Sequence, residues 1–133
     1  MKQTLSLALS CLWLCAALSV SGQTAQVEPA AKTFWSKFQS AVAKGDKEAV
    51  AAMTRFPLTM PYGVPSVKTK AQFLQRYAKI FDAETKRCFA AAKPERENNK
   101  SKRFNIACGE AMLYEFDFVN GEYKFIAVDN VNE

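Results

Sequence analysis

The spacing of apolar residues predicts helices in the first part of the chain and strands at its end. In residues 29–45 apolar side chains recur every three or four positions, which places them on one face of an amphipathic helix. The same spacing predicts a second long helix at 71–81, capped by the Thr-x-x-Gln pattern at Thr69. Short helices are expected after Asp46 and Asp82, since aspartate is a favoured N-cap residue.

Alternating apolar and polar residues replace the helical pattern after Arg103. The stretches "FNIAC", "EAMLYEFDFV" and "EYKFIAVDNV" are typical of strands, and Asn120-Gly121 between the last two indicates a two-residue hairpin turn. A short edge strand is expected at 56–60, followed by a proline-rich loop in which Tyr62-Gly63 forms a plain turn or, as the less favoured alternative, a lid.

The hairpin turn sets a register that separates the acids of the hairpin. Glu115 and Asp117 fall on the less apolar face, with Asp117 opposite Lys124, and act there as scaffold charges. Asp129 falls on the apolar face, where a carboxylate must be paired or must have a raised pKa. Asp129 is therefore the candidate acid or base, with Tyr114 as candidate proton donor; the alternative is a strand end at which Asp129 reaches solvent.

The first 22 residues have the pattern of a cleaved signal peptide. Lys2 precedes an apolar run that is shorter than a membrane span requires, and small residues follow it; a signal anchor is the alternative. Residues 23–133 then form one domain without a transmembrane segment, in the periplasm or secreted. Cys11 and Cys15 leave with the signal peptide. Cys88 and Cys108 are expected to form a disulfide in an oxidising compartment, or else to be two buried thiols.

Composition excludes several classes of site. The chain has no histidine, which removes histidine-based nucleophile activation and histidine metal ligands, and no cofactor or metal is expected. The full chain carries a net charge of +5, and cations and acids mix in residues 84–103. A solvated linker explains this stretch better than a nucleic-acid-binding surface does, so nucleic acid is not an expected partner.

The order of predicted elements resembles that of the nuclear-transport-factor-two-like superfamily, also called SnoaL-like or cystatin-like cone. The phrases "FQSAVAKGDKEAVAAM", "FPL", "FLQRYAKIF" and "NGEYKFIAVDN" are similar to those of small exported bacterial members. The resemblance covers residues 34–131 and implies an α+β fold in which N-terminal helices pack on a curved antiparallel sheet around a conical pocket. Some relatives use that pocket for proton transfer, whereas others only bind or dimerise.

These patterns favour a non-enzymatic exported domain that binds a small apolar molecule or an envelope protein. The expected pocket wall is aromatic: Trp35, Phe38, Tyr77, Phe116 and Phe125. An isomerase-like or cyclase-like enzyme that uses Asp129 is the first alternative. An envelope immunity or inhibitor protein, with residues 93–103 as its charged surface, is the second. A homodimer is compatible with each hypothesis.

Overall fold

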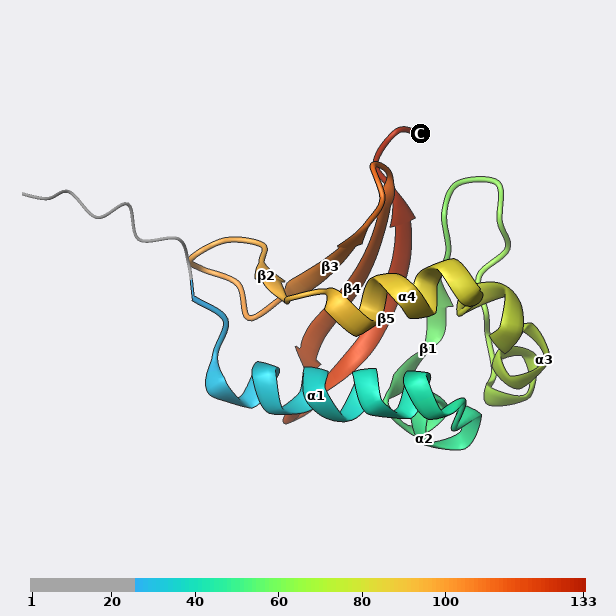
Figure 1. Cartoon of the computed structure of the whole chain (residues 1–133), viewed down its shortest axis with the longest axis horizontal. Coiled ribbons are helices and arrows are strands. Elements are labelled where there is room, and N and C mark those ends of the chain that lie inside the picture. The colour runs from blue at the N-terminus through green and yellow to red at the C-terminus, as the bar shows by residue number, and fades with distance from the viewer. Residues whose placement is uncertain (1–25) are drawn as a thin grey trace, which may run out of the picture.

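The computed structural model describes residues 26–133, and the predicted signal peptide at 1–22 lies outside them. Four helices cover one face of a five-stranded sheet (Figure 1). The helices are α1 (Pro29–Lys44), α2 (Lys47–Ala52), α3 (Lys70–Ile80) and α4 (Ala83–Ala91). The strands are β1 (Thr54–Thr59), β2 (Glu95–Arg96), β3 (Phe104–Cys108), β4 (Met112–Val119) and β5 (Glu122–Asn130). The predicted α+β class is confirmed.

Side chains cap three of the helices at the residues that the sequence indicates. The carboxylate of Asp46 accepts a hydrogen bond from the third backbone N–H that follows it, at 3.1 Å, and Asp82 does the same at 2.8 Å. The hydroxyl of Thr69 accepts the equivalent bond at 3.2 Å. Each cap satisfies a backbone donor that the first helical turn leaves free, so local sequence fixes where these helices begin.

The sheet has the order β1-β5-β4-β3-β2 and differs from the prediction at both edges. The pairs among β2, β3, β4 and β5 are antiparallel, but β1 runs parallel to β5, because the chain crosses the helical layer between them. At the other edge, Glu95 and Arg96 of the charged stretch form β2 and pair with β3. The charged stretch is therefore part of the sheet and not only a solvated linker.

One cluster of buried apolar side chains fills the space between the sheet and the helices. Helices α1 and α4 lie across the sheet. Phe38 of α1 is buried against Phe116 and Phe125 of the hairpin, and Phe89 of α4 is buried against Tyr114. Among residues 26–133, no helix combines the length and the apolar character that crossing a bilayer would need.

Candidate functional site

The β4–β5 hairpin has the predicted register near its turn. Asn120 and Gly121 both have positive φ angles, of 51° and 88°, as expected for a tight two-residue hairpin turn. Phe116 pairs with Phe125, and both side chains face the core. The register predicted from the turn residues is therefore confirmed for the half of the hairpin nearest the turn.

Beyond this pair the register shifts by one residue. Glu115 pairs with Ala127 instead of Ile126, so Ile126 is an extra residue on β5 and the strand carries a β-bulge. Successive side chains of a strand point to opposite faces of the sheet. One inserted residue therefore moves every later side chain of that strand to the opposite face. Val128 consequently takes the buried position opposite Tyr114.

The bulge moves Asp129 out of the candidate catalytic site. Asp129 pairs with Leu113, is exposed, and lies on the outer face of the sheet, whereas Tyr114 faces the core. The carboxylate of Asp129 accepts a hydrogen bond at 2.9 Å from the backbone N–H of the next residue. The placement of Asp129 on the apolar face is therefore corrected, and the predicted acid–base pair is separated by the sheet.

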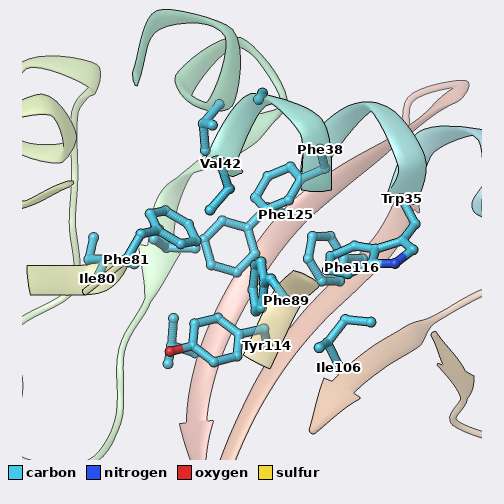
Figure 2. Packing of buried hydrophobic residues seen from close by; sticks show 14 of the residues in the cluster. Trp35, Phe38, Val42, Ile80, Phe81, Phe89, Ile106, Tyr114, Phe116 and Phe125 are labelled. Atoms are coloured by element: carbon cyan, nitrogen blue, oxygen red, sulfur yellow. The ribbon is translucent and has the colours of Figure 1, made fainter. Parts of the chain in front are cut away.

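Three of the predicted pocket residues form the filled centre of the core (Figure 2). Phe38, Phe116 and Phe125 have no exposed surface. The ring centroid of Phe38 lies 5.0 Å from that of Phe116 and 5.4 Å from that of Phe125. A side chain with no surface open to water lines no cavity that could hold a ligand, and rings at these separations are in contact. For these three residues the expected pocket wall is corrected to core packing.

The other two predicted pocket residues lie at the periphery of the aromatic core. Trp35 lines a cavity beside the start of α1. Tyr77 of α3 is buried, and its hydroxyl has no hydrogen-bond partner among the described residues. Burial raises the pKa of Tyr77, and the negative charge of Asp46 adds to the effect. Tyr77 therefore remains protonated at neutral pH.

Tyr114 marks the site where the core opens to the surface. Its hydroxyl shares a hydrogen bond of 2.9 Å with the hydroxyl of Thr85 in the first turn of α4, and both residues are largely buried. Tyr114 lines two neighbouring cavities, of about 640 Å³ and about 260 Å³, which also share Lys79 and Met112. Burial raises the pKa of Tyr114, against the lowering effect of its hydrogen bond with Thr85. The hydroxyl is thus a neutral polar group on a mostly apolar wall.

The smaller cavity is mainly apolar. Its lining includes Met60, Ile80, Met112 and Val128, all from the ends of β1, α3, β4 and β5. Methionine side chains are flexible and polarisable, so they adapt to apolar ligands of different shape. Two cations, Arg76 and Lys79, also line the cavity; the guanidinium of Arg76 donates a hydrogen bond of 2.8 Å to a carbonyl of the β1–α3 loop.

The larger cavity has polar and apolar surface in similar amounts and borders the disulfide. Cys88 of α4 and Cys108 of β3 are joined, with their Cα atoms 5.7 Å apart, so the predicted disulfide is confirmed. The cavity also contains charged groups of both signs: Asp82, Glu84, Lys79 and Arg87. Within residues 26–133 no three Cys, Asp or Glu side chains are grouped in a way that could hold a metal ion.

The β1–α3 loop borders the smaller cavity and is fixed at its base. Leu58 and Val67 exchange two backbone hydrogen bonds, of 2.8 and 3.0 Å, across the loop. Beyond them, Val64 lines the cavity with 41% of its surface exposed, and Tyr62 has 89% exposed. The loop therefore presents apolar side chains to solvent from an anchored base.

On the outer face of the sheet, Arg103 joins the scaffold acids. Its guanidinium contacts Glu115 and Asp117, each at 3.3 Å. Asp117 stands opposite Lys124 in the register, as predicted, but the ammonium of Lys124 pairs with Glu122 at 3.0 Å and donates to a carbonyl of α2. Arg103 therefore replaces Lys124 as the partner of the acids, and its charge is not free for a charged surface at 93–103.

Titration of the outer face tests this arrangement. Burial raises the pKa of Glu115 above its ordinary value of 4.5; Arg103 opposes the rise, and Asp129 adds to it. In a carboxyl ¹³C NMR titration, we expect the Glu115 midpoint to lie above 4.5, to rise further in Arg103→Gln and to fall in Asp129→Asn. An Asp129→Asn variant with an unchanged midpoint would place Asp129 away from this face.

Sequence reasoning found Tyr114 but missed most of its neighbours. Val128 faces the site only because of the bulge, and no residue of β5 predicts the bulge. Thr85 could have been found from the sequence, because it lies three residues after the Asp82 cap. At that position in the first turn of α4 its hydroxyl faces the sheet. The convergence of Met60, Ile80 and Val128 depends on the crossing of α3 between β1 and the hairpin.

No protein-family model matches the chain, and no curated protein matches it. Among solved structures, it is similar to an NTF2-like protein with a cystatin-like fold from Novosphingobium aromaticivorans. The two chains are 14% identical, with a TM-score of 0.40, and the match covers 76% of this chain and 78% of that one. At this TM-score the similarity carries no argument about family or activity.

Proposed function

We propose that the domain is a non-enzymatic binding module that takes a small, mainly apolar molecule beside Tyr114. One observation carries the proposal: the apolar cavity ends on a buried hydroxyl that a ligand with a polar end could reach. The cavity of about 260 Å³ is just below the roughly 300–1,000 Å³ of ordinary ligand pockets, and the adjoining cavity of about 640 Å³ gives a longer ligand room to extend.

The chemistry of the site favours binding over catalysis. Proton transfer at neutral pH needs a group with a pKa near the working pH, whereas the pKa of Tyr114 is raised from 10.0. Asp129 lies on the other face of the sheet and cannot assist. Tyr114 is therefore proposed to orient the polar end of a ligand through a hydrogen bond, and the methionines to contact its apolar part.

We place this binding outside the cytoplasm, in the periplasm or the medium. The disulfide supports this location, since such bonds form and persist in oxidising compartments. The signal-peptide pattern of residues 1–22 supports it independently. The other possibility named above, that the domain binds an envelope protein, stays a prediction.

Octanol binding tests the proposed site. With methionine methyl groups labelled by ¹³C, adding 1-octanol to the full chain should shift the resonances of Met60 and Met112, which line the cavity, and leave that of Met53 unchanged. Val64→Trp should lower the affinity about tenfold, because the indole fills space for which a ligand would otherwise bury about two methylene groups.

Val131→Trp is the matched control, since Val131 is also an exposed valine but does not line the cavity. Its affinity for octanol should equal that of the unmodified chain. If all methionine signals move together, or if the two tryptophan variants bind octanol equally, the cavity beside Tyr114 is not the binding site.

A further inference from the structure

A separate cavity, of about 1,010 Å³, lies where α1 begins, at the end of the molecule away from the β1–α3 loop (Figure 1). It is bounded by residues 26–27 before α1, by Lys32 and Trp35 of α1, and by residues 93–99 around β2. It has no residue in common with the cavities beside Tyr114. Whatever it binds, it binds independently of the proposed function.

The indole of Trp35 lines this cavity and carries an N–H donor. Trp35 is 5% exposed, and within residues 26–133 its N–H has no hydrogen-bond partner. Trp35 lines the cavity, so this donor lies beside it.

Packing holds the indole in this orientation. The rings of Phe89 and Phe116 meet it edge to face, with centroids 5.1 and 5.7 Å from its own. Figure 2 shows the nitrogen of Trp35 on the side of the ring away from Phe116. The donor therefore points outward from the aromatic core and is fixed before any ligand arrives, which lowers the entropic cost of binding.

The opposite wall is held by Arg96. Its guanidinium donates hydrogen bonds to the carbonyls of Ser101 at 2.8 Å, Gln26 at 3.4 Å and Asn99 at 3.5 Å. These bonds tie the segment before α1 to the loop after β2. The cavity is thus bounded by connected backbone rather than by separate loose segments.

The charges that line the cavity favour an anion. Lys32 and Lys93 form no ion pair among the described residues. Of the two acids on the wall, Glu97 lies 3.9 Å from the guanidinium of Arg103, which Glu115 and Asp117 share at 3.3 Å, and Glu95 forms no ion pair among the described residues. With Arg96 included, the lining carries an excess of positive charge beside the apolar surfaces of Trp35, Val27 and Pro94.

We propose that this cavity is a second binding site, which takes a small planar molecule bearing a carboxylate. The planar part would lie against Pro94, Val27 and the open edge of the indole, where apolar contact is favourable. The carboxylate would accept the Trp35 N–H and approach Lys32 and Lys93, since hydrogen bonds to a charged acceptor are stronger than those between neutral groups. A neutral molecule of the same shape would lose most of this interaction.

The indole N–H resonance of Trp35 reports directly on the site. Trp13 and Trp35 are the two tryptophans of the chain, so comparing the full chain with Trp35→Phe assigns the signal. We expect 2-naphthoate to shift the Trp35 N–H resonance saturably, and the neutral isostere 2-naphthamide to bind at least about tenfold more weakly. Equal binding of the two compounds, or no shift with naphthoate, would overturn the proposal.

Lysine variants test the site without altering the core. Lys32→Ala and Lys93→Ala should each weaken naphthoate binding, by up to about fivefold for an exposed charge pair. The matched control is Lys37→Ala together with Lys86→Ala, which removes two exposed cations from α1 and α4 outside the cavity. If the control variant weakens binding as much as the double variant Lys32→Ala/Lys93→Ala, general charge attraction explains the binding and the assigned site is wrong.

Discussion

Replacing Phe116 by alanine should lower the free energy of unfolding by about 3–5 kcal/mol, the largest single effect that we expect in this chain. Phe116 has no exposed surface, and its ring lies 4.8 Å from that of Phe104, 5.0 Å from Phe38 and 5.3 Å from Phe125, centroid to centroid. Removing the ring leaves a cavity among rigid rings that cannot collapse into it. Chemical denaturation monitored by circular dichroism measures the loss.

Phe118 supplies the matched control. It lies two residues further along β4 on the same face, but 38% of its surface is exposed beside the ammonium of Lys102, which lies 4.3 Å from the ring centroid. Phe118→Ala should therefore cost about 1 kcal/mol or less. If Phe116→Ala were equally mild, Phe116 would be lining open space, and the original prediction of a pocket wall would stand in place of the filled core.

Breaking the disulfide should have the second largest effect. The bond between Cys88 and Cys108 closes a loop with a sequence separation of 20 residues, for which the chain-entropy model gives about 3 kcal/mol. The double variant Cys88→Ser/Cys108→Ser should unfold at correspondingly lower denaturant concentration. Adding a reductant to the unmodified chain should produce the same loss, and adding it to the double variant should change nothing.

The disulfide also bears on the proposed site, because it ties α4 to β3 at the border of the larger cavity. Thr85 lies one turn before Cys88 on α4 and holds the Tyr114 hydroxyl. We therefore expect the double variant to bind octanol more weakly even without denaturant, in addition to being less stable. Thiol titration of the denatured, unreduced mature protein provides the direct chemical check: two free thiols per chain would contradict the bond.

Local sequence was sufficient for the elements whose ends are fixed by their own residues. The caps at Asp46, Thr69 and Asp82 stand where the sequence predicts them, since a side chain bonds a backbone group three residues away whatever the rest of the fold does. The Asn120-Gly121 turn is equally local. The order of the helices and of the strands other than β2, and with it the α+β class, follows from these signals and from the two periodicities.

The candidate site was predicted less well, because its residues come from separate elements. The expected aromatic pocket assumed that a face rich in rings leaves space between them, but rings from α1, α4 and the hairpin interdigitate and fill it. Whether such side chains leave a gap depends on distances between elements, which no periodicity encodes. Trp35 lines the cavity beside the start of α1, together with residues of the β2 segment.

By itself, the sequence determined the helix starts, the hairpin turn and the buried faces of the helices, and it predicted the bond between Cys88 and Cys108. The tertiary structure decided the parallel placement of β1, the strand formed by Glu95 and Arg96, and the side of the sheet on which Asp129 lies. The physical reason is one of range. Caps and turns are closed by atoms a few residues apart, whereas a bulge inserts a residue that strand alternation cannot reveal, and it reverses every side chain beyond it.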